Sequence, residues 1–196
     1  MSSATEGTEN RCSWCLGSEL YRHYHDTEWG VPCRDAVQLF ELISLEGAQA
    51  GLSWITILNK RQGYRRLFAG FDPEKIARFS DARLDRIASD AAIVRHRQKV
   101  ESVRSNARAW LSLREAGQSF SDVIWAHVEH ETLDNAFRQL SDVPARTEQS
   151  TRMSKQLKKL GFSFVGPTTC YAFMQAAGLV NDHLITCPRH AEVKSG

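Results

Sequence analysis

Residues 45–58 read LEGAQAGLSWITIL, and the prediction of the fold starts from this stretch. It is apolar almost throughout, yet it contains one carboxylate, Glu46, and one large aromatic, Trp54. The small residues between them let a flat ligand or another backbone approach closely. A carboxylate in apolar surroundings is costly unless hydrogen-bond donors satisfy it. Two interpretations follow: a ligand whose polar edge Glu46 reads while Trp54 stacks on its face, or a buried helix with a satisfied glutamate and a core tryptophan.

Outward from this stretch, length and composition describe an ordinary single domain. A chain of 196 residues buries roughly 70% of its unfolded surface, which is enough for a hydrophobic core. No apolar run approaches about 18 residues, so no segment is predicted to cross a membrane. The first ten residues, MSSATEGTEN, are polar and do not resemble a signal peptide. We therefore predict a disordered tail over residues 1–10 and a cytoplasmic protein.

The net charge of +2 says little about partners, but its distribution is uneven. Residues 95–108 contain five basic side chains and one acid, and residues 152–159 contain four basic side chains and no acid. The basic residues are Arg95, Arg97, Lys99, Arg104, Arg108, Arg152, Lys155, Lys158 and Lys159. Such clusters form either a solvated helix face or a nucleic-acid footprint.

Helical periodicity recurs along the chain, whereas period-two alternation is nearly absent. We therefore predict an all-α fold without strands. The expected helices span 35–45, 47–64, a short stretch opened by Asp72-Pro73, another opened by Ser80 or Asp81, 95–114, 119–125, 151–160 and 168–177. Residues 131–148 are predicted to be mostly loop.

Cysteine and histidine side chains gather near both ends of the chain. His183 and Cys187 are four residues apart, which on a helix places both on one face. Together with Cys12 and His25 they would complete a tetrahedral zinc site that joins the two ends. The competing interpretation takes Cys12 and Cys15 as a C-x-x-C redox motif, but that motif works beside a βαβ unit and none is visible.

Several motifs resemble the 3-methyladenine DNA glycosylase I family. They are Arg11-Cys12-x-Trp14, Tyr24-His25-Asp26-x-Glu28-Trp29-Gly30-Val31-Pro32, Leu45-Glu46-Gly47-x-Gln49-Ala50-Gly51-Leu52-Ser53-Trp54, Gly161-Phe162-x-Phe164-Val165-Gly166 and Asn181-Asp182-His183. The resemblance extends from Arg11 to about Cys187. It implies a helical member of the helix-hairpin-helix DNA glycosylase superfamily, and the activity of the resembled family, which is excision of 3-methyladenine from alkylated double-stranded DNA.

The resemblance also implies roles for particular residues. One structural zinc would be held by Cys12, His25, His183 and Cys187. The base pocket would comprise Glu46, Tyr24, Trp54, Trp14 and Tyr21. DNA would meet Gly51 and Leu52 at the gap left by the displaced nucleotide, and Arg95 and Arg97 at a hairpin over residues 90–97. This chain departs from the family pattern with Ala92 and Gln98, where glycine is common.

Together these observations predict one glycosylase domain over residues 11–187, a C-terminal tail over 188–196, and a monomer that needs no protein partner. Glu46 is expected to recognise the base rather than activate water. The helical run after the hairpin, residues 95–113, contains no aspartate of the kind that many relatives use in catalysis. Two alternatives remain: a non-enzymatic, zinc-stapled module that binds nucleic acid, and a thiol oxidoreductase built on Cys12 and Cys15. No role is expected for Cys15, Cys33, Cys170, His23 or His190.

Overall fold

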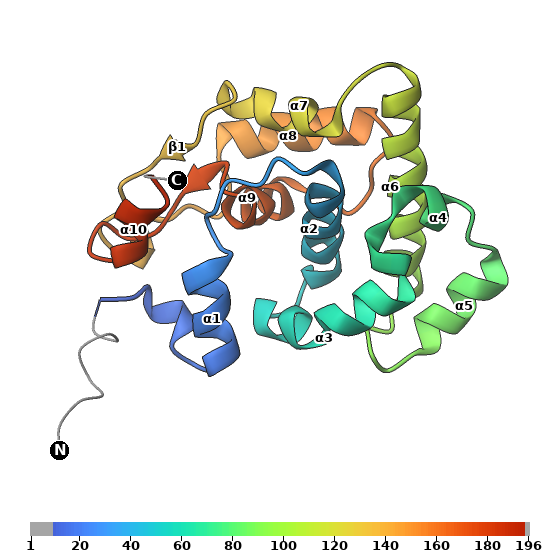
Figure 1. Ribbon diagram of the computed structural model, residues 1–196, viewed down its shortest axis with the longest axis horizontal. Coiled ribbons are helices and arrows are strands. Elements are labelled where there is room, and N and C mark those ends of the chain that lie inside the picture. Colours follow the sequence, from blue (N-terminus) through green and yellow to red (C-terminus); the bar gives the residue numbers. More distant parts are fainter. Residues whose placement is uncertain (1–9, 195–196) are drawn as a thin grey trace.

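The computed structural model describes residues 10–194, and this part of the chain is almost entirely helical (Figure 1). The α-helices are α1 (Glu19–Thr27), α2 (Ala36–Gln49), α3 (Trp54–Leu67), α4 (Pro73–Ala77), α5 (Asp81–Ser89), α6 (Arg97–Glu115), α7 (Phe120–Trp125), α8 (Glu148–Lys159), α9 (Pro167–Ala176) and α10 (Pro188–Glu192). Single 3-10 turns are η1 (Ser13–Cys15), η2 (Ala69–Phe71), η3 (Ala126–Val128) and η4 (Leu140–Asp142). Within residues 10–194, no helix is long and apolar enough to cross a membrane.

Capping side chains fix where several helices begin, as the sequence predicted. Asp35 accepts hydrogen bonds from the Val37 and Gln38 amides at the start of α2. Ser80 and Ser119 each cap the helix that follows them. These side chains satisfy backbone N–H groups that have no partner inside the helix.

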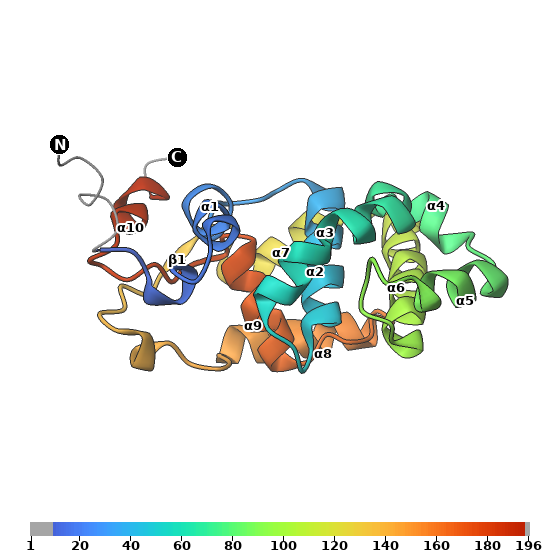
Figure 2. The same ribbon diagram turned by 90° about the horizontal axis from the view of Figure 1, so that it is seen from below.

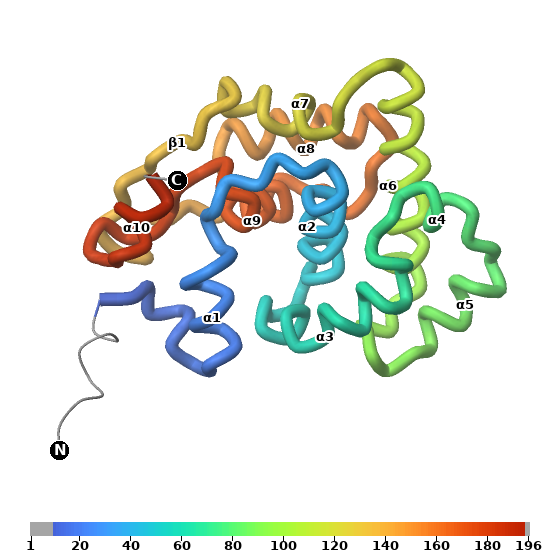
Figure 3. Tube along the Cα trace, in the orientation of Figure 1, coloured from blue at the N-terminus to red at the C-terminus, as the bar shows by residue number. Residues whose placement is uncertain are grey.

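Helix α2 lies at the centre of the molecule and joins two groups of helices (Figures 1 and 3). One group contains α3 to α6, in which α4 and α5 pack against α6. The other contains α7 to α9, in which α8 packs along α9. Helix α2 contacts α3, α6, α7 and α9, so a single hydrophobic core runs through both groups. The carboxyl end of α2 therefore lies at the junction of the two groups.

The single helix predicted over 47–64 is wrong, because the chain turns at residues 50–53. Helix α2 ends at Gln49 and α3 begins at Trp54. Gly51 occupies the turn with φ +81°, a backbone conformation that favours glycine. The apolar run continued the helical pattern through this turn, so periodicity alone could not locate it. As a result Glu46 and Trp54 lie on two different helices that meet at an angle.

The expectation of no strand is also wrong in one place. Strands β1 (Leu133–Asp134) and β2 (Val180–Asn181) pair in parallel, with Leu133 opposite Val180 and Asp134 opposite Asn181. Two-residue strands are too short for period-two alternation to reveal. The pairing anchors the long connection before α8 to the segment that follows α9.

Both ends of the domain contain structure that the sequence did not predict. Helix α1 fills the interval before the first predicted helix, and α10 lies where residues 188–196 were expected to form a tail. Val193 is buried, so the folded region extends beyond the predicted boundary at 187. The N-terminal segment from residue 10 lies beside α10 in both views (Figures 1 and 2). The tail predicted over residues 1–10 lies, up to residue 9, outside the described residues.

Candidate active site

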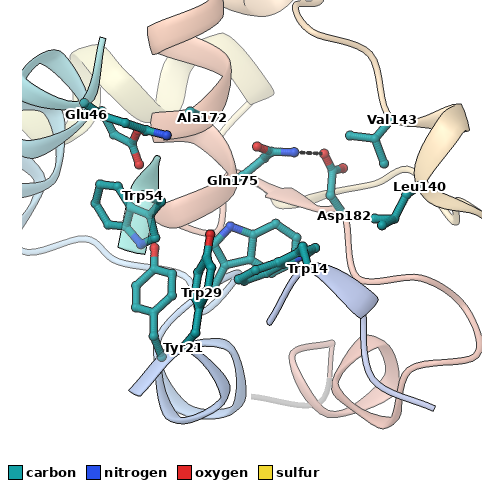
Figure 4. A pocket seen from close by; sticks show the side chains of 12 residues that line it. Trp14, Tyr21, Trp29, Glu46, Trp54, Leu140, Val143, Ala172, Gln175 and Asp182 are labelled. Atoms are coloured by element: carbon teal, nitrogen blue, oxygen red, sulfur yellow. Dashed lines mark hydrogen bonds between the residues drawn. The ribbon is translucent and has the colours of Figure 1, made fainter. Parts of the chain in front are cut away.

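A cavity of about 210 Å³ opens between α1, the end of α2, the start of α3 and α9 (Figure 4). It is lined by Trp14, Tyr21, Tyr24, Trp29, Glu46, Gln49, Trp54, Leu140, Val143, Ala172, Gln175 and Asp182. The structure thus brings together all five residues that the sequence assigned to a pocket. Aromatic rings form most of its wall, a lining that suits a flat ligand.

Glu46 is the unusual group in this cavity. Its side chain lies on the last turns of α2 and the residue is only 4% exposed. Among the described residues, Glu46 Oε2 has no hydrogen-bond partner. Burial without a partner raises the pKa of Glu46 from 4.5 to about 8. Burial therefore favours the neutral form of the Glu46 carboxyl.

Trp54 contributes a second unsatisfied group to the same cavity. Its indole Nε1 is buried and has no hydrogen-bond partner within residues 10–194. The Tyr24 ring lies 5.5 Å from the Trp54 ring at 46°. Burial, and then the negative charge of Glu46, raise the pKa of Tyr24 well above 10. The pocket thus presents an acceptor and a donor beside ring faces, and neither is used by the protein itself.

Asp182 is a second buried acidic side chain in the cavity, and unlike Glu46 it has hydrogen-bond partners on both oxygens. It accepts hydrogen bonds from the Tyr171 hydroxyl at 2.6 Å, the Gln175 amide at 2.7 Å and the Asn135 amide at 2.7 Å. In Figure 4 the Asp182–Gln175 pair lies at the end of the pocket opposite Glu46. Donors of the protein itself thus satisfy both carboxylate oxygens of Asp182.

Seven lining residues were not singled out from the sequence: Trp29, Gln49, Leu140, Val143, Ala172, Gln175 and Asp182. A signal existed for Gln49, which follows Glu46 by three residues and so shares its helix face. Trp29 and Asp182 lie inside motifs that the resemblance used. Leu140 and Val143 come from a stretch predicted as loop, and no local pattern indicated their approach to the cavity.

The predicted metal ligands converge next to this pocket. Cys12, His25, His183 and Cys187 are all buried, and their ligand atoms lie within 4.8 Å of one another. His183 Nδ1 lies 3.2 Å from His25 Nε2, 3.9 Å from Cys187 Sγ and 4.0 Å from Cys12 Sγ. In tetrahedral zinc sites with Zn–S of about 2.3 Å and Zn–N of about 2.0 Å, ligand atoms are roughly 3.3–3.8 Å apart. The cluster fits such an ion.

The outer ring nitrogens of both histidines are also bound. His25 Nδ1 lies 2.7 Å from Asp26 Oδ1, and Asp26 in turn pairs with Arg11. His183 Nε2 lies 3.0 Å from the Trp29 carbonyl. Such partners orient metal-bound imidazoles and fix which nitrogen faces the ion. The interaction between the two thiols lowers the pKa of Cys187 and raises that of Cys12.

His183 and Cys187 do not lie on one helix face, as a helical spacing would require. His183 follows β2, and Cys187 precedes the first residue of α10. A turn brings the two side chains together, because the Cys187 amide donates to the Leu184 carbonyl at 2.8 Å.

Cys15 does not form a redox pair with Cys12. Its thiol donates to the Cys12 carbonyl, and burial raises the pKa of Cys15 to about 11. A buried, protonated thiol is a poor nucleophile. Cys170 is buried and Cys33 is half-buried, and His23 is exposed. His190 contacts Asp134 at 2.9 Å outside the cluster.

The residues assigned to DNA lie on two turns. Gly51 and Leu52 occupy the α2–α3 turn next to the pocket, and Leu52 is 41% exposed. Arg95 is exposed on the turn between α5 and α6. Arg97 begins α6 and contacts Asp85 at 2.5 Å, an ion contact without hydrogen-bond alignment, and Glu101 at 2.9 Å. Its charge is thus already compensated within the protein.

Ala92 and Gln98 do not disturb the α5–α6 turn. Neither residue has a positive φ, so neither position requires glycine. The Ala92 amide donates to Asp90. The Ala92 carbonyl approaches Gly63 so closely that a Cβ added at position 63 would lie only 2.3 Å from its oxygen. Gly63 of α3 therefore allows the close crossing that brings this turn against the helix.

Comparisons with known proteins agree on one group. A family model described as methyladenine glycosylase matches residues 14–190. The chain is 50% identical over 177 residues to DNA-3-methyladenine glycosylase 1 of Escherichia coli (strain K12), covering 90% of this chain and 95% of that protein. It is similar to a crystal structure of 3-methyladenine DNA glycosylase I with a TM-score of 0.90 and 48% identity, over 91% of this chain and 98% of that one. A variant of such an enzyme, crystallised in complex with 3-methyladenine, gives a TM-score of 0.88 at 38% identity, over 91% and 96% of the two chains.

Proposed function

The chain belongs to the methyladenine glycosylase family, and from this premise we propose that it removes 3-methyladenine from alkylated DNA by hydrolysing the N-glycosidic bond. The observation that carries the proposal is the pair of unsatisfied groups in the pocket, Glu46 Oε2 and Trp54 Nε1. Buried polar groups in native proteins normally have partners. A purine edge would supply an N–H to the carboxylate and an acceptor to the indole.

The pocket distinguishes a methylated base from an ordinary one by its charge. Methylation at N3 makes the base in DNA cationic. A cation beside Glu46 favours the ionised carboxylate, whose charge burial otherwise disfavours. The Tyr24 and Trp54 faces add cation–π attraction. Undamaged adenine is neutral and offers no such compensation, so ionisation of Glu46 beside it would stay unfavourable.

The chemical step follows from the same charge. The C1′–N bond breaks and its electron pair moves to the base, which neutralises the positive charge on the ring. Water adds to C1′ and loses a proton to solvent. Because the cationic base already leaves readily, the pocket binds and orients the lesion, and Glu46 recognises the base. The only acids of α6 are Glu101, which is paired with Arg97, and Glu115, the last residue of the helix, and neither lines the cavity.

A base inside a duplex cannot reach this cavity, so the nucleotide must first be extruded. The α5–α6 pair, joined at residues 90–96, is the helix-hairpin-helix element that would hold the backbone. Its α6 end offers N–H groups without acids in the first turn, an arrangement that suits a phosphate. The turn that contains exposed Leu52 lies between Glu46 and Trp54 in the sequence. It would enter the gap that the extruded nucleotide leaves between the stacked base pairs. Both features lie along the edge of the molecule that faces the viewer in Figure 2.

One zinc ion would be held by Cys12, His25, His183 and Cys187. Four protein ligands leave no position for an activated water, so the ion would be structural. It would hold three pocket residues in place through their neighbours in sequence. Trp14 is two residues after Cys12, Tyr24 precedes His25, and Asp182 precedes His183. The support for this proposal is the mutual geometry of the four ligands and the partners of both imidazoles.

Release of 3-methyladenine from methylated duplex DNA tests the function directly. We expect the purified protein to release this base and to leave undamaged adenine in place. A nucleic-acid-binding module would bind the same duplex, but it would neither release the base nor bind free 3-methyladenine. The buried Glu46 favours the enzyme over such a module, because phosphate contacts do not require an unsatisfied internal carboxyl.

A further inference from the structure

Lys99 occupies a position that none of the roles above explains. It lies in the first turn of α6, directly after the α5–α6 turn, and the residue is only 9% exposed. Its Nζ donates to the Ala48 carbonyl at 2.9 Å and to the Ala50 carbonyl at 2.6 Å. Within residues 10–194 it forms no ion pair with a carboxylate. Lys99 therefore lies between two helices, where burying its ammonium group has a desolvation penalty that an apolar side chain would not have.

The two carbonyls explain why a cation is stable there. Ala48 belongs to the last turn of α2, and Ala50 is the residue that ends the helix. Carbonyls at a helix end have no partner inside the helix and carry partial negative charge. Lys99 satisfies both of them with one side chain. The last turn of α2 and the residue that begins the α2–α3 turn are thus fixed to α6.

This contact joins the two segments that face DNA. On one side lies the α2–α3 turn, with exposed Leu52 only two residues after Ala50. On the other side lies the α5–α6 turn, which ends where α6 begins. A second contact acts from α3, where Lys60 Nζ donates to the Ala91 carbonyl at 2.6 Å. Both helices that flank the Leu52 turn are therefore tied to the α5–α6 element.

We propose that Lys99 is a positioning residue that sets the placement of the Leu52 turn relative to the hairpin that holds the DNA backbone. When the hairpin grips the duplex, the turn then enters the space vacated by the extruded nucleotide. The inference rests on the proposed function. It assigns Lys99 no contact with the base, because Lys99 does not line the cavity. Helix α2 is also held at Gly47, whose backbone packs closely on Phe164. Loss of Lys99 should therefore affect extrusion and leave the pocket intact.

The test is a double-mutant cycle of Lys99→Met and Leu52→Ala, measured by single-turnover excision of 3-methyladenine. Lys99→Met should slow excision from a fully paired duplex by at least about 10-fold, while affinity for free 3-methyladenine stays within about 2-fold. The double variant should be no slower than the slower single variant, because both substitutions would disrupt the same extrusion step and effects of coupled residues are not additive. With the lesion opposite a gap, where extrusion costs least, the defect of Lys99→Met should shrink to about 3-fold or less.

Arg104→Met is the matched control. Arg104 lies on the same helix and also donates to a backbone carbonyl, that of Phe79, but it contacts neither turn. It should lower the melting temperature and leave excision unchanged. If Lys99→Met does not fold, Lys99→Gln takes its place in the cycle, since its amide keeps donors without the charge. Additive effects, a parallel loss of free-base affinity, or equal slowing in Arg104→Met would overturn the proposal. A wild-type protein that released no base would instead contradict the proposed function.

Discussion

Two groups of buried polar side chains lie next to each other, and neighbouring residues of the same segments supply both. In the Cys/His cluster, both imidazoles have partners for their outer nitrogens and the ligand atoms face one another. In the pocket, Glu46 and Trp54 each have a buried atom without a partner in the described part of the chain. Buried polar groups that satisfy one another, or that need only one bound ion, stabilise the fold. Buried polar groups left unsatisfied in a cavity destabilise the fold, and a bound ligand that satisfies them offsets this destabilisation.

The largest effect is expected from removing a ligand of the cluster. His183→Ala or Cys12→Ser should lose about one equivalent of zinc and lower the melting temperature by roughly 10 °C or more, because metal binding is linked to folding. Elemental analysis and thermal melting measure both. The matched control is Cys15→Ser, a buried cysteine three residues from Cys12, which should keep the metal. Protein without zinc that is equally stable would remove the basis for calling this cluster structural.

On the pocket side, Glu46→Gln should weaken binding of free 3-methyladenine and slow excision together, each by roughly 100-fold. This magnitude is that of a hydrogen bond to a charged group, up to about 3 kcal/mol. Base affinity and single-turnover rate should be measured on one preparation. A general base would behave differently: affinity would stay normal while excision fell by roughly 10²–10⁴-fold. That outcome would show that the unsatisfied carboxyl serves chemistry rather than recognition.

The cost of the unsatisfied carboxyl should itself be measurable without ligand. Its pKa is raised from 4.5 to about 8, so the contribution of Glu46 to the free energy of unfolding is largest below pH 4.5 and falls as the pH rises toward 8. Each pH unit in this window costs up to about 1.4 kcal/mol. Glu46→Gln should therefore melt progressively higher than wild type between pH 5 and pH 8, by roughly 10 °C at pH 8. Parallel melting curves for Glu46→Gln and wild type would show that Glu46 is not the titrating group, with Glu115→Gln as the surface control.

A smaller effect should isolate the indole donor. Trp54→Phe keeps an aromatic face and removes only Nε1–H, which should weaken free-base affinity by about 5- to 10-fold. Trp110 offers a matched control, because its Nε1 is also buried without a partner among the described residues but lies outside the cavity. Trp110→Phe should leave base affinity unchanged. Equal losses of free-base affinity in Trp54→Phe and Trp110→Phe would show that the unsatisfied Trp54 Nε1 does not mark the ligand site.

The smallest effect is expected at the α5–α6 turn, where one arginine is exposed and another is already paired within the protein. Arg95 is exposed, whereas Arg97 is already paired with Asp85 and Glu101. Arg95→Ala should reduce the slope of log affinity against log salt by about one, since one phosphate contact is lost. Arg97→Ala should leave that slope unchanged. DNA affinities at three or more salt concentrations decide this. An equal reduction of the slope in both variants would show that Arg97 also contacts a phosphate, as the family resemblance implied.

Residue type and the family resemblance predicted which side chains gather better than periodicity predicted the course of the chain. Glu46 stood out as a lone carboxylate in an apolar run, and the predicted zinc ligands Cys12, His25, His183 and Cys187 do gather in one buried cluster. The turn at Gly51 escaped notice, because apolar residues on both sides continued a helical pattern. Leu140 and Asp182 reach the cavity only through long connections and the β1–β2 pairing, and contacts between distant segments leave no local periodicity. Lys99 looked like one more basic residue, since its carbonyl partners come from another helix.

The Cys/His cluster and the pocket each combine segments from both ends of the chain, which affects the order of events during synthesis. Trp14 and Tyr24 emerge from the ribosome early, whereas Asp182 and His183 follow more than 150 residues later; Cys12 and His183 are 171 residues apart. At translation rates of about 5–20 residues per second, the early half of the cluster waits roughly 10–30 s for its partner. During that interval the thiol of Cys12 is available to other metals and oxidants. A nascent chain cannot bind a base until its last segment closes the cavity, so fragments released early would not compete for lesions.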